Sequence, residues 1–267
     1  MSVAVPEFGG FIRSDMGLNR TDAGAFESPT AAEFEVAFVD QMGSTVQELL
    51  ISCWGQPFEW GRPVRSFSSH RGQRSFSGLW WFSRTGHHVG YESWLERDQL
   101  MTLDADAEVI AVASQPFWLS WSAGQRRVRH APDFFVRFRD GSASVVDVRA
   151  DDRIEPEDAA KFAASAQACA SVGWGYQRVG GLPPPLAANL RWLSGYRHPR
   201  CHDPVRAAAL LETFAAGSPL MTGAVGVGDP VAVLPVLFHL LWRGRLLADL
   251  TAPLGVDTEV RTADGSR

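Results

Sequence analysis

Four residues near the middle of the chain have the types and the spacing that phosphodiester chemistry requires. They are Glu92, Asp133, Asp147 and, two residues after the last acid, Arg149. Two carboxylates that lie close together do not both ionise readily unless a cation lies between them. Mg²⁺ takes carboxylate oxygens and water as ligands, and Mn²⁺ can substitute for it. Glu92, Asp133 and Asp147 are therefore candidate ligands of a metal that activates water and stabilises charge on a leaving oxygen.

The two aspartates are expected to lie on paired antiparallel strands. Runs rich in Phe and Val, at 133–138 and 143–150, flank an Asp-Gly pair at 140–141, and such a pair is a strong hairpin signal. The register decides whether the acids meet, because side chains alternate between the two faces of a sheet. A connection with an odd number of residues puts Asp133 opposite Asp147 on one face, whereas a two-residue loop separates them. A site here therefore predicts an odd loop or a bulge at the Asp-Gly pair.

A cation completes the candidate site. Arg149 falls on the same strand face as Asp147 and is expected to stabilise a phosphate there. Arginine keeps its proton, so it cannot act as a general acid or base. The chain contains a single lysine, Lys161, on a helix expected at 155–172. It could in principle reach the site, but a solvated position is the favoured interpretation because charged side chains are mostly exposed.

The elements that must position these residues follow an α/β pattern. A helix is expected at 90–103, with Trp94 and Leu95 facing the core. Glu92 and Glu96 lie one turn apart on it, so either acid could project toward the hairpin. Further strands are expected at 33–39, 109–112, 117–121 and 176–179. Strand, hairpin, helix and strand in this order predict a mixed sheet flanked by helices.

Several segments of the sequence resemble one known family. Glu92, the P-D at 132–133 and the D-x-R at 147–149 resemble the PD-(D/E)xK nuclease pattern. The segments Y-E-S-W-L-E-R-D, S-Q-P-F-W-L and H-A-P-D-F-F are similar to those of TnsA-like transposase endonuclease subunits. The likeness favours Glu92 over Glu96 as the third acid. The family pattern has a lysine where this sequence has Arg149.

The resemblance implies a restriction-endonuclease-like core and a function. A TnsA-like subunit would cleave one strand of double-stranded DNA at each transposon end. A DDE-type transposase (TnsB-like) would cut the other strand, and an ATPase regulator (TnsC-like) would be a further partner. The implied site is Glu92, Asp133, Asp147 and Arg149, with Mg²⁺ as cofactor. Because arginine replaces the usual lysine, the alternative is a catalytically silent nuclease-fold adaptor that binds the transposase or the regulator.

Four segments are expected along the 267 residues. Residues 1–30 show little periodicity and are expected to be mobile. Residues 31–180 are expected to form the TnsA-like nuclease domain, followed by a Gly- and Pro-rich linker region at 181–202. The sequence pattern of residues 203–267 predicts three helices and a hairpin, an arrangement that resembles a winged helix. Because the helix expected at 230–242 is nearly all apolar, this domain is expected to dock a protein such as the regulator rather than read DNA bases.

The charge distribution bears on DNA binding. A net charge of -5 argues mildly against an autonomous DNA binder, because affinity for DNA comes from neutralising phosphates. Arg126, Arg127 and Arg129 nevertheless cluster just before Asp133. This cluster fits a contact near the scissile phosphate and a solvated turn about equally well.

The remaining features restrict other classes of function. Three scattered cysteines do not predict a disulfide framework. His198, Cys201 and His202 lie close together in sequence, but a fourth ligand for zinc is not evident. The sequence shows no secretory signal, and its longest apolar run is too short to span a membrane. A cytoplasmic protein without membrane contact is therefore expected.

Overall fold

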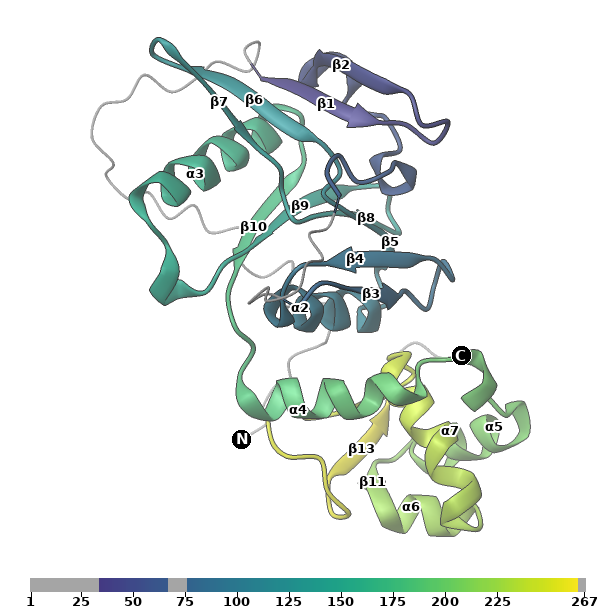
Figure 1. Cartoon of the computed structure of the whole chain (residues 1–267). Coiled ribbons are helices and arrows are strands. Elements are labelled where there is room, and N and C mark those ends of the chain that lie inside the picture. Colours follow the sequence, from purple (N-terminus) through teal and green to yellow (C-terminus); the bar gives the residue numbers. More distant parts are fainter. Residues whose placement is uncertain (1–33, 67–75, 264–267) are drawn as a thin grey trace. The chain divides into compact units, whose positions relative to one another are not determined.

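The structure is a computed structural model that describes residues 34–66 and 76–263. The chain divides into two compact units. The described residues of the first unit fall within 16–99 and 108–181, and those of the second within 100–107 and 182–267. Figure 1 traces the elements of both units. The segment expected to be mobile, 1–30, lies outside the described residues.

A mixed sheet in the order β10-β9-β8-β5 forms the centre of the first unit. The strands are β5 (Val109–Ser114), β8 (Phe134–Phe138), β9 (Ala143–Val148) and β10 (Gly175–Val179). β10 runs parallel to β9, and the other pairs are antiparallel. The parallel pair needs a crossover, which is α3 (Pro156–Ser171), a helix that lies beside β9 and β10 (Figure 1). The expected order of strand, hairpin, helix and strand and the mixed α/β class are confirmed.

The β8–β9 hairpin has the odd connection on which the candidate site depends. Phe134 pairs with Val146, and the backbone N–H of Phe138 donates to the carbonyl of Ser142 at 3.0 Å. Three residues, 139–141, therefore form the loop. Gly141 has φ +83°, the left-handed conformation that a three-residue hairpin loop requires at this position. One step beyond the last strand pair, the register brings Asp133 opposite Asp147.

A second sheet in the order β2-β1-β6-β7 belongs to the same unit. Its strands are β1 (Glu35–Val39), β2 (Thr45–Leu49), β6 (Trp118–Ala123) and β7 (Arg126–His130). The short α1 (Leu50–Cys53) and the 3-10 turn η3 (Phe58–Trp60) follow β2. The buried ring of Phe58 lies 4.9–5.6 Å from the rings of Phe38, Phe117, Phe135 and Trp174. This aromatic cluster joins the second sheet to the β8–β9 hairpin.

The element that precedes the central sheet differs from the expectation. The helix expected at 90–103 is α2 (Trp94–Ala105), because His88–Tyr91 forms strand β4, which pairs with β3 (Gly78–Trp81). The hydroxyl of Ser93 accepts the N–H of Glu96, the third residue of the helix, at 3.1 Å, and this capping bond fixes where the helix begins. Glu92 therefore lies in the connection before α2 and not on the helix. Trp94 was expected in the core but is 46% exposed.

The second unit is mainly helical. It contains α4 (Pro184–Leu193), α5 (Pro204–Thr213), α6 (Leu220–Val227) and α7 (Pro230–Trp242). The strands β11 (Ser218–Pro219), β12 (Leu246–Ala248) and β13 (Glu259–Thr262) form an antiparallel sheet in the order β11-β13-β12. Short 3-10 turns are η4 (Asp151–Arg153) in the first unit, and η5 (Ser194–Tyr196) and η6 (Pro199–Cys201) in the second. The expected C-terminal helices and hairpin are therefore present, and α7 is mostly buried.

The interval 181–202, expected as a linker region, contains α4, and its residues from 182 onward belong to the second unit. Pro184 and Pro185 occupy the first turn of α4, where proline is accepted because its missing N–H would have no partner inside the helix. Asn189 of α4 is buried and donates to the carbonyls of Leu250 and Ala252 at 2.9 and 2.7 Å. These bonds fasten α4 to the segment between β12 and β13.

Two further expectations concern metal and membrane. Among the described residues, His198, Cys201 and His202 are not part of a group of three or more side chains arranged to hold a metal ion. Within residues 34–66 and 76–263, we find no helix with the length and apolar character needed to cross a membrane.

Candidate active site

One cavity of about 380 Å³ in the first unit brings the four predicted site residues together. Its wall comes from the hairpin, from the start of α2, from β6 and β7, and from α3. The lining residues include Glu92, Asp133, Asp147 and Arg149, together with Arg65, Glu96, Trp118, Arg129, His130, Asp158 and Lys161. Polar atoms dominate this wall. The cavity therefore has the character of a site for a charged substrate.

The two aspartates are held by directed hydrogen bonds. Asp133 Oδ2 accepts the backbone N–H of Val148 at 2.7 Å. Asp147 is 1% exposed, and its two oxygens lie 2.8 Å from His130 Nε2 and 2.8 Å from Tyr176 Oη. Because a carboxylate only accepts, these partners are donors, and Nε2 of His130 carries the hydrogen. Both oxygens of Asp147 are thus oriented before any ligand binds.

His130 and Tyr176 were not predicted as site residues. His130 lies in the H-A-P-D-F-F segment, and Tyr176 begins the strand expected after the helix, so both positions were visible in the sequence. Their contact with Asp147 depends on the pairing of β6 with β7 and of β9 with β10. The two-residue turn Gly124–Gln125 is a local signal for the pairing of β6 with β7, whereas no local pattern reports the parallel pairing of β9 with β10.

The electrostatics of the cavity favour a bound cation. Burial raises the pKa of Asp133 well above its ordinary value, and the negative charges of Glu96 and Asp147 raise this pKa further. The N–H of Val148 and the charge of Arg65 act in the opposite direction. Burial also raises the pKa of Glu96. Crowded acids of this kind are stabilised when a cation joins them.

Glu92 and Glu96 both lie on the cavity wall, in different environments. The carboxylate of Glu92 forms an ion pair with Arg65, at 2.5 Å from Nη2. Glu96 accepts the N–H of Glu92 at 2.7 Å and the hydroxyl of Ser93 at 2.8 Å. The charge of Glu96 is one of those that raise the pKa of Asp133. The geometry thus makes Glu96 at least as strong a candidate for the third acid as the predicted Glu92.

The basic side chains of the wall are mostly engaged. Arg149 Nη2 lies 2.9 Å from Asp158, and Arg149 Nε donates to the carbonyl of Arg153 at 3.0 Å. Lys161 lies 3.1 Å from the exposed Glu157 and is itself 25% exposed, so it is partly solvated and also lines the cavity. Arg149 directly follows β9 and Lys161 lies on α3, and both line the cavity that holds the acids.

The donor set fits a hard divalent metal in part. Among the described residues, no three or more His, Cys, Asp or Glu side chains are arranged to hold a metal ion. Mg²⁺, however, is commonly bound through one or two carboxylates, with water and substrate phosphate completing the shell. Asp133 and Asp147, on adjacent positions of one hairpin, meet that requirement. The ion pair with Arg65 leaves Glu92 a weaker candidate ligand than these two.

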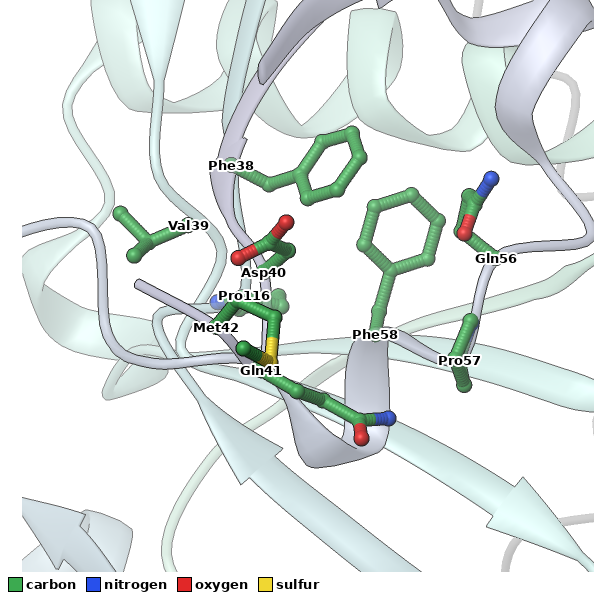
Figure 2. A pocket seen from close by; sticks show the side chains of 10 residues that line it. Phe38, Val39, Asp40, Gln41, Met42, Gln56, Pro57, Phe58 and Pro116 are labelled. Carbon is green, nitrogen blue, oxygen red and sulfur yellow. The ribbon is translucent and has the colours of Figure 1, made fainter. Parts of the chain in front are cut away.

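A second cavity, of about 250 Å³, lies elsewhere in the first unit (Figure 2). Its wall is formed by Phe38, Met42, Pro57, Phe58 and Pro116 with a few polar side chains. Asp40 is the acid on this wall among the described residues, and its Oδ1 accepts the N–H of Ser44 at 2.8 Å within its own turn. Paired acids are what hydrolysis of a phosphodiester needs, so the first cavity is the candidate active site.

The first unit combines a mixed central sheet with a cavity lined by acids. Residues 106–179 match the family model described as TnsA-like endonuclease N terminal. The matched segment runs from β5 to β10 and includes Asp133, Asp147 and Arg149, so the resemblance to TnsA-like endonucleases is confirmed for this part of the chain. A comparison with curated proteins gives no match.

Proposed function

We propose that the chain is the metal-dependent DNA endonuclease subunit of a heteromeric transposase. It would hydrolyse one strand of double-stranded DNA at transposon ends, while a DDE-type transposase cuts the other. The observation that carries the proposal is the register that brings Asp133 opposite Asp147 in a polar cavity, within the segment that matches TnsA-like endonucleases.

The residues of the cavity would divide the chemistry among them. Asp133 and Asp147 would hold Mg²⁺, or Mn²⁺ in its place, and His130 and Tyr176 would keep Asp147 oriented. A bound metal would supply activated water and stabilise the leaving oxygen. Glu92, or Glu96, which lines the same cavity and accepts the N–H of Glu92 from the start of α2, would act as the third acid.

Two basic residues would serve the phosphate. Arg149 would stabilise negative charge on the phosphate after leaving Asp158. Because arginine cannot exchange a proton, Lys161 on the cavity wall is the side chain that would do so.

The second unit would bind a protein partner. The order α5, β11, α6, α7, β12, β13 is that of a winged helix, which supports the proposed domain type. Burial of α7 argues against a helix that reads bases. A largely apolar cavity of about 410 Å³, lined by Trp192, Leu234 and Phe238 among others, supports docking of the ATPase regulator (TnsC-like) or the transposase (TnsB-like).

A cleavage assay with the variant Asp133→Asn tests the nuclease proposal. The full chain is mixed with its transposase and regulator partners, a transposon-end DNA duplex and Mg²⁺, and nicks at each strand are mapped. The substitution is expected to abolish the nick at one strand and leave the transposase cut. Asp152→Asn, an exposed acid outside the cavity, is the control and is expected to cleave normally. Normal cleavage by Asp133→Asn would refute the proposal.

A silent adaptor is the second candidate, and one observation favours it. Arg149, which stands where the family has lysine, is held by Asp158 and the Arg153 carbonyl in place of a phosphate. Arg149→Lys separates the candidates. The nuclease proposal expects wild type to cleave, whereas the adaptor expects no cleavage by wild type and new cleavage in the variant.

A further inference from the structure

Arg129 projects into the cavity from the edge of a sheet. It lies on β7, the last strand in the order β2-β1-β6-β7, and pairs with Ser120 of β6. Its guanidinium carbon lies 4.4 Å from the ring centroid of Trp118, which lines the same cavity. Arg129 is exposed to solvent. Stacking on an aromatic face holds the guanidinium in place and leaves its N–H edge available for an anion.

The other cations of the wall each have an acidic partner. Arg65 pairs with Glu92, Arg149 with Asp158, and Lys161 with Glu157. Within residues 34–66 and 76–263, Arg129 forms no ion pair with a carboxylate. It is therefore the cavity cation whose charge is not already balanced in the described part of the chain. A phosphate that enters the cavity would meet this guanidinium without having to displace an acid.

The rest of β7 continues the basic edge away from the acids. Arg126 is exposed at the end of the strand nearest the β6–β7 turn, and Arg127 forms an ion pair with Glu35. Val128, between Arg127 and Arg129, packs against the hydrophobic core, so the neighbouring arginines point away from it. By the same alternation, Arg126 lies on the opposite face of the strand from Arg129, and Arg127, on the same face as Arg129, is already paired with Glu35. Arg129 is therefore the cation of β7 that lines the cavity with no acidic partner among the described residues.

We propose that the edge strand β7 is a DNA-backbone surface and that Arg129 binds a phosphate next to the scissile one, an inference that rests on the nuclease function proposed above. A planar guanidinium matches two oxygens of one phosphate, and the contact with the Trp118 ring restricts its position at the cavity. Such contacts position the strand and carry no sequence information. The contact would align the scissile phosphate with Asp133 and Asp147.

Salt-dependent binding of the full chain to duplex DNA tests this surface. Anisotropy of a fluorescein-labelled duplex is measured in EDTA, so that cleavage does not occur, between about 50 and 200 mM salt. Arg129→Gln is expected to weaken binding to unrelated sequences equally and to lower the slope of log affinity against log salt by about one. Arg129→Lys is expected to keep the slope while binding more weakly, because the ammonium loses the planar stack and the two-point contact.

Arg139→Gln is the matched control. Arg139 is 61% exposed on the hairpin loop and does not line the cavity, so this variant is expected to bind as wild type does. An unchanged slope in Arg129→Gln would overturn the proposal, and so would wild-type binding that does not depend on salt. If Arg129→Gln keeps the slope while Asp133→Asn abolishes cleavage, the DNA surface is refuted and the nuclease function stands. If Arg129→Gln lowers the slope of log affinity against log salt but Asp133→Asn cleaves normally, the nuclease function is refuted and the DNA-binding surface stands.

Discussion

His130 Nε2 lies 2.8 Å from Asp147 Oδ1, across 17 residues of sequence. The other oxygen of Asp147 accepts the hydroxyl of Tyr176 at 2.8 Å, so a nearly fully buried carboxylate has one donor on each oxygen. Burial and the charge of Asp147 raise the pKa of Tyr176, which keeps this hydroxyl protonated as a donor. The arrangement fixes the direction in which Asp147 presents its remaining lone pairs to the cavity.

Removal of His130 should therefore weaken the proposed metal site through Asp147. Partners that orient a ligating side chain typically contribute about 10–100-fold in metal affinity or activity. We expect His130→Ala to lower Mn²⁺ affinity and cleavage by that factor. His130→Gln, whose amide can donate a comparable hydrogen bond, is expected to recover part of the loss. His88→Ala, an exposed histidine on β4, serves as the control. Equal affinity in His130→Ala and wild type would contradict this role.

Asp133 should make the metal-free chain less stable as the pH rises. Its pKa in the folded chain is raised above 3.8 by burial and by Glu96 and Asp147, so the folded state binds more protons than the unfolded state. The free energy of unfolding then falls as the pH increases from about 3.8 through the raised value. Asp133→Asn removes this loss, because the amide cannot ionise.

Thermal melting in EDTA measures the effect. Asp133→Asn is expected to melt above wild type at pH 8, by about 2–4 °C for each kcal/mol of repulsion relieved, with a smaller difference at pH 5. Added Mg²⁺ should stabilise wild type and not the variant. A variant that melts below wild type at both pH values would show that the repulsion does not govern stability.

Substitution of Lys161 tests whether a side chain of this protein transfers the proton during cleavage. General acid–base catalysis by a positioned side chain contributes about 10²–10⁴-fold to the rate. We expect Lys161→Met to reduce cleavage by that amount. Lys161→Arg should be as slow if proton transfer is the role of the lysine, and should cleave normally if only its charge matters. Full activity in Lys161→Met would remove Lys161 from the mechanism.

Substitution of Gly223 on α6 tests how tightly the core of the second unit is packed. A Cβ at this position would lie 2.3 Å from Cζ of the fully buried ring of Phe214. Gly223→Ala is expected to destabilise this unit by about 1–3 kcal/mol, the usual penalty for overpacking a core. Hydrogen exchange should report faster exchange in α5, α6 and α7. Gly226→Ala, with open space around the added carbon, is the control and should be neutral.

The hairpin could be predicted from sequence because its determinants are local. The Asp-Gly pair and the Phe- and Val-rich runs specify a tight antiparallel connection, and an odd loop was the condition for the acids to meet. The start of α2 was placed too early, since the apolar periodicity that marks a helix continues into strand β4. This error put Glu92 on a helix and hid the cap that involves Ser93 and Glu96.

The partners of the acids could not be predicted, because they depend on pairing between distant segments. Tyr176 reaches Asp147 across 29 residues, through the parallel pairing of β9 with β10. The ion pairs of Arg149 with Asp158 and of Arg65 with Glu92 likewise depend on how α3 and the segments before β3 and α2 pack. Residue types therefore identified the cavity, and tertiary contacts decided which side chains are engaged in it.

Calorimetric titration of Mn²⁺ tests most directly whether Asp133 and Asp147 form a metal centre. The wild-type chain, Asp133→Asn and the exposed control Asp152→Asn are titrated with and without a DNA duplex, which can supply the phosphate ligand. We predict binding by wild type and Asp152→Asn and none by Asp133→Asn under the same conditions. Equal binding by all three chains, or no binding by wild type in the presence of DNA, would contradict a metal-dependent nuclease centre at this hairpin.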